Sequence, residues 1–174
     1  MTIYSGLLAA TVLLSLAGAA EAQETTPQDV QIIGRAMSFT QGAKRQPATL
    51  AVVFDGADPV SVQQKNATLA AVGKGLSIGE RTLVAVAVEQ SQLGSASGYD
   101  GVFTTAGVDQ TRLRRFLSRS GVPCFTLDTA QVSEGACAVA VRSRPKVTIS
   151  FSSSNAAAAD VKFATAFIMM VREL

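Results

Sequence analysis

The sequence predicts an α/β domain of three layers, with helices on both faces of a mostly parallel β-sheet. Between residues 49 and 141, short apolar runs alternate with segments of helical periodicity, which is typical of βαβ units. Residues 136–151 contain two strand patterns across a short break, which indicates an antiparallel hairpin at an edge of the sheet. A wide apolar stripe then predicts a C-terminal helix packed across the sheet.

An export signal is expected to precede this domain. Residues 7–17 are largely apolar and uncharged, and this run is too short to span a membrane comfortably. Ala20-Glu21-Ala22 matches the small-x-small cleavage signal, although no Lys or Arg precedes the apolar run. We therefore expect residues 1–22 to be a cleaved signal peptide and residues 23–174 to form a single domain.

The composition excludes several kinds of function. Removal of the leader takes away Glu21 and no base, so the formal net charge changes from +2 to +3, which is too mild to indicate a nucleic-acid partner. The chain has no His, which excludes His-based acid–base catalysis and the common His-containing metal sites. We expect no catalytic residue, no metal and no cofactor.

The first half of the domain is expected to supply a helix, a strand and a second helix. Residues 29–39 have helical apolar spacing, and residues 49–54 have the composition of a buried strand. A Pro suits the first turn of the next helix, over residues 59–72. The Gly-Lys-Gly at 73–75 follows that helix, so we interpret it as a helix C-cap and not as a phosphate-binding loop.

The middle of the chain continues the alternation. Strands are expected at 82–88 and 101–104, joined by a flexible connection rich in Ser and Gly. Residues 109–119 form an amphipathic helix that leads to a strand at 122–127. One row of this helix, either a solvated face or a docking surface for an acidic partner, contains Arg112, Arg115 and Arg119.

The last forty residues have the clearest patterns. Residues 136–141 are apolar throughout, as in a strand covered on both faces, and the strand at 146–151 alternates strictly. We expect Val147, Ile149 and Phe151 to face the core and Lys146, Thr148 and Ser150 to face water. A helix should then begin within 152–155 and reach Leu174. Its two buried rows would contain Val161, Ala164, Ile168 and Val171, and Phe163, Phe167, Met170 and Leu174.

The chain has two cysteines, Cys124 and Cys137, near the starts of consecutive predicted strands. An exported protein meets oxidising conditions, so a disulfide is the first interpretation, and two separate buried thiols are the alternative. A bridge that closes a loop of this length would contribute about 3 kcal/mol.

A ligand crevice is expected beyond the carboxyl ends of the parallel strands. Free amides at the helix starts that follow could hold an anion or a small polar ligand. The same residue types are what strand-ending turns and helix N-caps require, so both interpretations stay open. The candidates are Asp55, Gly56, Thr104, Thr105, Asp128 and Thr129.

The C-terminal sequence also resembles a known family. Residues 142–149 match a hairpin of the type R-x-x-P-x-V-x-I, and residues 163–170 match a helix that contains F-x-x-A-F-x-M-M. On these motifs the chain resembles the YfiR family of bacterial periplasmic proteins. Weaker similarity extends over nearly all of residues 23–174.

The resemblance implies a periplasmic domain related to one lobe of a substrate-binding protein, with no catalytic motif. It also implies a regulator that binds the periplasmic sensor domain of a membrane-bound diguanylate cyclase and so lowers cyclic di-GMP and biofilm formation. Disulfides act as redox-sensitive control in some members, but two cysteines allow a single bridge. The alternative function is a small-ligand-binding module that acts with a transporter or a sensor.

A partner surface is expected on the C-terminal helix. Met169 lies outside both apolar rows, beside Lys162 and Arg172, and an exposed Met with apolar neighbours suits protein binding. A homodimer contact or the N-terminal helix is the alternative cover for this surface. The arginine row of residues 112–119 is a further candidate for partner binding.

Overall fold

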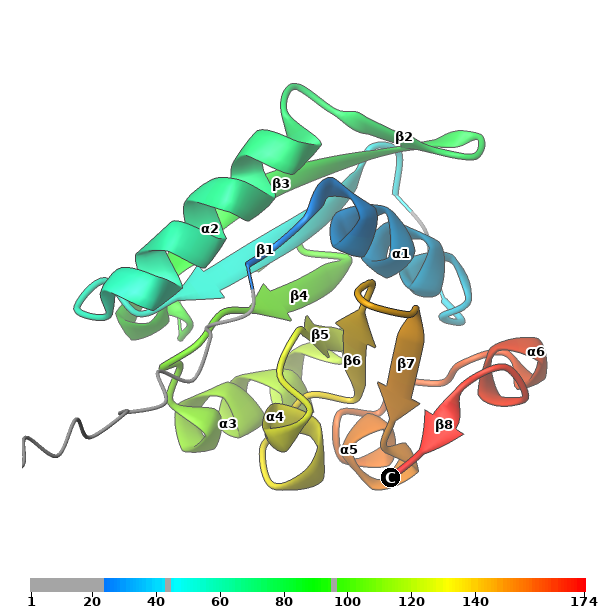
Figure 1. Cartoon of the computed structure of the whole chain (residues 1–174). Helices are drawn as coiled ribbons and strands as arrows, with labels where there is room; N and C mark the ends of the chain where they lie inside the picture. The colour runs from blue at the N-terminus through cyan, green and yellow to red at the C-terminus, as the bar shows by residue number, and fades with distance from the viewer. Residues whose placement is uncertain (1–23, 43–44, 95–96) are drawn as a thin grey trace, which may run out of the picture.

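A computed structural model of the chain describes residues 24–42, 45–94 and 97–174, which form one eight-stranded sheet with helices packed on it (Figure 1). The strand order is β2-β3-β1-β4-β5-β6-β7-β8. The strands are β1 (Ala48–Phe54), β2 (Leu76–Ile78), β3 (Arg81–Glu89), β4 (Gly101–Thr104), β5 (Cys124–Thr126), β6 (Val139–Arg142), β7 (Thr148–Phe151) and β8 (Arg172–Glu173). The helices are α1 (Pro27–Ser38), α2 (Pro59–Val72), η1 (Gln90–Gln92), α3 (Gln110–Ser120), α4 (Ala130–Ser133), α5 (Ser153–Ala158) and α6 (Thr165–Ile168). The expected signal peptide lies outside the described residues.

The central strands β3, β1, β4, β5 and β6 are parallel. The chain passes from β1 outward to β3 and then returns to β4, so the order of strands reverses between β1 and β4. β2 pairs antiparallel with β3, and β7 pairs antiparallel with β6. The predicted α/β class, with a mostly parallel sheet and an antiparallel hairpin, is confirmed.

The three longer helices lie within two residues of their predicted ends. Thr26 forms a capping box at α1, because its hydroxyl accepts from the Asp29 amide and the Asp29 carboxylate accepts from the Thr26 amide. α2 begins at Pro59 and ends at Gly73, whose positive φ of 57° confirms the predicted C-cap. α1 contacts α2. The crossovers β1–α2–β3 and β4–α3–β5 run in opposite directions along the sheet, so the right-handed rule expects α2 and α3 on opposite faces.

The hairpin differs from its predicted form in three ways. β6 begins at Val139 instead of residue 136, because the amides of Ala136 and Cys137 donate to Gln110 and Gln131 instead of to a neighbouring strand. Val147 precedes β7 and is 47 % exposed, so its predicted place in the core is wrong. Ser150 is buried, not solvated, because its pairing partners in β6 and β8 lie on the same face and flank it. β8 pairs with β7 outside the hairpin, so the hairpin is not the edge of the sheet.

The prediction of a single C-terminal helix is wrong. The segment instead forms α5, α6 and β8. After α5 the backbone turns at Asp160, which has a φ of 51°. Residues 161–164 then run beside residues 39–41: the Gln41 amide donates to the Lys162 carbonyl, and the Ala164 amide donates to the Phe39 carbonyl, each at 2.8 Å. These bonds replace the ones that a continuous helix would make.

Four phenylalanines hold this irregular segment on the sheet. Phe163 and Phe167 stack with ring centroids 4.9 Å apart, and Phe151 meets both rings edge-on at 5.4 and 6.0 Å. Phe39 lies 5.6 Å from Phe167. The predicted burial of Phe163 and Phe167 is confirmed. The predicted burial of Ile168, Met170 and Leu174 is wrong, because α6 ends after one turn and leaves them exposed.

Candidate functional site

A disulfide joins Cys124 to Cys137, which confirms the first interpretation of the two cysteines. Both residues are buried, at 2 % and 0 % exposure, and their Cα atoms are 4.6 Å apart. The bridge connects the start of β5 to the segment that enters β6. A buried bridge of this kind is compatible with an oxidising compartment.

The residues of the predicted ligand crevice lie beyond the ends of β1, β4 and β5, and β1 and β4 end side by side. The Ser61 hydroxyl, from the first turn of α2, is 2.5 Å from the Thr105 hydroxyl and accepts from the Asp55 amide. The Thr105 hydroxyl also donates to the Val53 carbonyl. Gly107 packs so closely on α2 that an added Cβ would lie 2.5 Å from an Asp58 carboxylate oxygen. The start of α2 therefore occupies this edge of the sheet.

Gln131 fills the neighbouring part of the crevice. Its side-chain oxygen accepts from the hydroxyls of Thr104 and Thr126, and its amide nitrogen donates to the Thr105 carbonyl. Asp128 accepts from the Ala130 amide at the start of α4. The structure thus brings Asp55, Gly56, Thr104 and Thr105 together, while Asp128 and Thr129 follow the next strand. The bonded groups here serve the turns and the packing of the edge.

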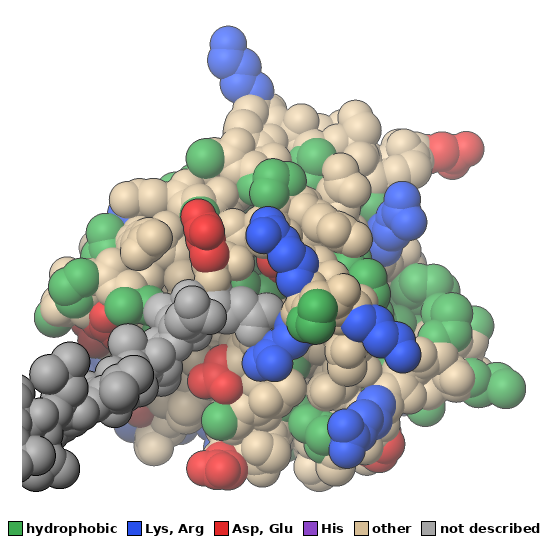
Figure 2. Space-filling model, in the orientation of Figure 1, with side chains coloured by type: hydrophobic (Ala, Val, Ile, Leu, Met, Phe, Trp, Pro, Cys, Tyr) green, Lys and Arg blue, Asp and Glu red, His purple; other side chains and the backbone are tan. Residues whose placement is uncertain are grey.

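An exposed apolar surface surrounds α6 and β8. Met169 is 83 % exposed and Met170 is 64 % exposed, which confirms the predicted exposure of Met169. Figure 2 shows hydrophobic side chains gathered at the right of the molecule, over the position of α6 in Figure 1. Because Met169 stays exposed with α1 in place, the N-terminal helix does not cover it. We use the name C-terminal surface for the exposed side chains of this segment, which are Lys162, Ile168, Met169, Met170, Arg172 and Leu174.

β8 gives the C-terminal surface an open strand edge. It pairs with β7 on one side and is the last strand of the sheet. The Leu174 amide donates to the Phe151 carbonyl at 2.9 Å, and the Glu173 carboxylate accepts from the Ser153 amide at 3.0 Å. These bonds hold the side of β8 that faces β7. Its outer edge presents backbone groups of the kind that another chain can pair with.

The predicted partner residues fall on two separate surfaces. Arg112, Arg115 and Arg119 lie on α3, whereas Lys162, Met169 and Arg172 belong to the C-terminal surface. Figure 1 shows α3 and α6 well apart, with α5 between them. Arg112, Arg115 and Arg119 line, together with Arg45, a cavity of 460 Å³, which we call the arginine cavity.

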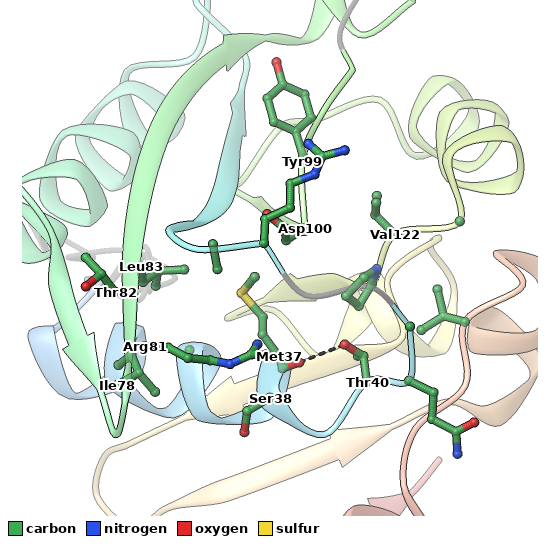
Figure 3. A pocket seen from close by; sticks show the side chains of 18 of the residues that line it. Met37, Ser38, Thr40, Ile78, Arg81, Thr82, Leu83, Tyr99, Asp100 and Val122 are labelled. Atoms are coloured by element: carbon green, nitrogen blue, oxygen red, sulfur yellow. Dashed lines mark hydrogen bonds between the residues drawn. The ribbon is translucent and has the colours of Figure 1, made fainter.

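A second cavity, of 230 Å³, lies at the amino ends of the parallel strands (Figure 3). It shares Arg45, Tyr99 and Val122 with the arginine cavity, so the two adjoin. Asp100 also lines it, but its carboxylate accepts from the Thr49 amide at 2.9 Å and so fixes the start of β1. No sequence pattern indicated this cavity, because ligand sites of parallel sheets are expected at the carboxyl ends of the strands.

Two stretches match the letters of nucleophile motifs without the structure that those motifs need. Gly75-Leu76-Ser77-Ile78-Gly79 has the form G-x-S-x-G, but Ser77 lies in the β2–β3 hairpin and not at a strand-to-helix turn. Ser143-Arg144-Pro145-Lys146 has the form S-x-x-K. Ser143 is buried beside the Thr26 hydroxyl at 3.2 Å, and its amide donates to Asp29, so it ties β6 to the start of α1.

Comparison with models of known protein families and with curated proteins finds no match to this chain. The fold and the surfaces define a disulfide-bonded α/β domain with an exposed apolar surface at one edge of its sheet. Within residues 24–42, 45–94 and 97–174, none of the helices combines the length and the apolar character that a membrane crossing requires.

Proposed function

We propose that the protein is a periplasmic regulator that binds the sensor domain of a membrane-bound diguanylate cyclase and restrains it, which lowers cyclic di-GMP and biofilm formation. The observation that carries the proposal lies in the F-x-x-A-F-x-M-M motif. Phe163 and Phe167 of this motif are buried in the aromatic cluster, whereas Met169 and Met170 point to solvent. Packing of the domain explains the two phenylalanines and leaves the two methionines for a partner.

The chemistry of the C-terminal surface suits a protein partner. Methionine side chains are flexible and polarisable, so they adapt to an apolar groove on another protein. Lys162 and Arg172 are exposed in the same C-terminal segment and favour a partner that carries acidic residues around such a groove. Binding would restrain the cyclase if the sensor domain held this contact more tightly in its inactive conformation than in its active one.

The proposed location rests on the expected signal peptide and is supported by the buried disulfide. Edman sequencing of protein recovered from the periplasm should give Gln23 as the first residue. A soluble protein that retained Met1 would contradict the export step.

The partner is tested by capture and by the cellular cyclic di-GMP level. The purified protein, immobilised and mixed with detergent-solubilised membranes of its own cells, should retain a membrane protein that mass spectrometry identifies by its cyclase domain. Deletion of the gene should raise cyclic di-GMP, and its return should restore the lower level. Capture of a transporter permease with an unchanged cyclic di-GMP level would favour the ligand-binding module instead.

A further inference from the structure

The arginine cavity has the size and the lining of a small-molecule site. Its volume of 460 Å³ lies within the range of about 300–1,000 Å³ that is typical of ligand pockets. It opens between α3 and the described residues 93–94 and 97–99, which lie between β3 and β4. Its inner wall is apolar: Leu93 is 1 % exposed and Phe116 is 9 % exposed, and Val122 lies half-buried beside them.

Positive charge surrounds this apolar wall. Arg112, Arg115 and Arg119 come from α3, and Arg45 comes from the loop before β1. The described residues that line the cavity include no Asp and no Glu. A buried apolar wall with cationic groups at its mouth matches a ligand with an apolar body and an anionic end.

Within the described residues, these arginines have donors that remain for such a ligand. Arg45 donates to the Gly98 carbonyl at 2.6 Å, Arg112 donates to the Gln90 carbonyl at 3.3 Å, and Arg119 donates to the Arg115 carbonyl at 2.9 Å. A guanidinium has five N–H donors, so one such bond leaves most of them for an anion. The bonds fix each side chain at the rim of the cavity.

Stabilisation of α3 alone does not explain the arrangement. Arginines near a helix C-terminus interact favourably with the helix dipole, and Arg119, in the last turn of α3, fits that role. Arg45 belongs to no helix, however, and it reaches the cavity from a segment far away in the sequence. The helix dipole also does not account for a cavity with an apolar wall beneath these charges.

We propose that the arginine cavity binds a small organic anion, a carboxylate whose aromatic or aliphatic body lies on Leu93 and Phe116. The guanidinium groups would hold the carboxylate by charge-assisted hydrogen bonds, which the planar fork of arginine can make in pairs. The inference goes beyond the proposed function, because the cavity and the C-terminal surface lie on separate parts of the molecule.

The experiment is a calorimetric titration of the purified protein with 2-naphthoate and with octanoate, and with 2-naphthamide as the uncharged match of the first. We expect saturable one-site binding of at least one of the two acids. The amide should bind at least about tenfold more weakly, because it cannot form charge-assisted bonds. Raising the salt concentration from 0.05 to 0.5 M should weaken binding of the acid and leave the amide unchanged.

Arginine variants locate the site. Arg112→Gln and Arg115→Gln should each weaken binding of the acid about tenfold, since each removes a charged donor. Arg114→Gln is the matched control: the side chain sits on the same helix and carries the same charge, but it donates to the Gly135 carbonyl and does not line the cavity. Arg172→Gln controls for binding at the C-terminal surface. Thermal unfolding of each variant verifies that it is folded.

Four outcomes would overturn the proposal. The first is no saturable binding of either acid, and the second is equal affinity for 2-naphthoate and 2-naphthamide. The third is an equal loss of affinity in Arg114→Gln and Arg115→Gln, which would mean that only the net charge of the protein matters. Loss in Arg172→Gln with no loss in Arg112→Gln would place the ligand on the C-terminal surface and would also overturn it. None of these outcomes bears on cyclase binding, which is measured separately.

Discussion

The arginine cavity and the C-terminal surface present their side chains by different means. α3 is a regular helix, with Asp109 as its N-cap and Gly121 as a left-handed C-cap, so helical periodicity places the arginines of the rim. α6 has one turn and lies in an irregular segment, where the buried ring of Phe167 holds Met169 and Met170 outward. A surface on a regular helix rests on many repeated bonds, whereas the C-terminal surface depends on a few buried anchors.

Their shapes also suit different partners. The arginine cavity is concave, charged at its rim and apolar at its inner wall, which suits a small anion. The C-terminal surface projects from the sheet beside an open strand edge, which suits another protein. Changes that act on one surface should therefore leave the other intact.

The largest expected effect comes from removal of the buried Phe167 ring. Phe167→Ala deletes a ring that is 2 % exposed and contacts three other rings, so the free energy of unfolding should fall by about 3–5 kcal/mol. Met169→Ala, two residues away, should change it by less than about 0.5 kcal/mol, because that side chain is exposed. Urea denaturation measures both. Similar losses of stability in the two variants would contradict the view that Phe167 holds the segment while Met169 contributes nothing to the fold.

The disulfide should have the next largest effect. Cys124→Ser and Cys137→Ser should each lower the free energy of unfolding by about 3 kcal/mol, since each opens the same loop. The double variant should lose no more than either single variant, because one bond cannot be broken twice. Additive losses, or two reactive thiols in the native protein, would show that the cysteines act separately.

A smaller effect concerns the cap of α3 and its dependence on pH. Hydrogen bonds from the Arg112 and Thr111 amides, assisted by the charges of Arg112 and Arg115, hold the pKa of Asp109 below its ordinary value of 3.8. A carboxylate with a lowered pKa in the folded state stabilises the fold above its unfolded pKa, and this contribution is lost as the pH falls below 3.8 through the folded value. The substitution Asp109→Asn removes this pH-dependent contribution.

The measurement for Asp109 is the urea midpoint at pH 6 and at pH 3. The wild type should lose more stability between these two values than Asp109→Asn, since the other carboxylates titrate in both proteins. An identical loss in both proteins would mean that Asp109 makes no stabilising contribution as an anion.

The sequence predicted the parallel part of the fold well, because its signals are local. The strand at 49–54 and the helix at 59–72 have strong apolar patterns with Pro and Gly at their boundaries, and the observed ranges differ by at most one residue. The disulfide also followed from compartment and spacing. The strand, the helix and the disulfide could be predicted because they depend on residues close in the sequence and on the order of consecutive strands.

The C-terminal segment could not be predicted from periodicity. Phe163 and Phe167 are four residues apart, and this spacing fits one face of a helix as well as the aromatic cluster that they form. No Gly or Pro marks the turn at Asp160, and β8 has two residues, too few for a strand pattern. The bonds that straighten residues 161–164 come from residues 39–41, which are distant in the sequence.

The arginine cavity was visible in the sequence only as a row of charges. Helical spacing predicts that Arg112, Arg115 and Arg119 share one face of a helix. Only the folded chain brings Arg45 to the same cavity. Leu93 lies in the connection that was predicted to be flexible, yet it is among the most buried side chains of the domain. A cavity formed by three distant segments has no local sequence pattern.

The substitution Met169→Glu tests the central claim most directly. At 83 % exposure the site should tolerate the charge, so the melting temperature should stay within about 2 °C of the wild type. Val86→Glu, at another exposed apolar side chain on β3, is the matched control. Cyclic di-GMP is then measured in cells that carry the cyclase. We predict that Met169→Glu no longer lowers it and that Val86→Glu lowers it as the wild type does. Full repression by a stably folded Met169→Glu protein would contradict the account.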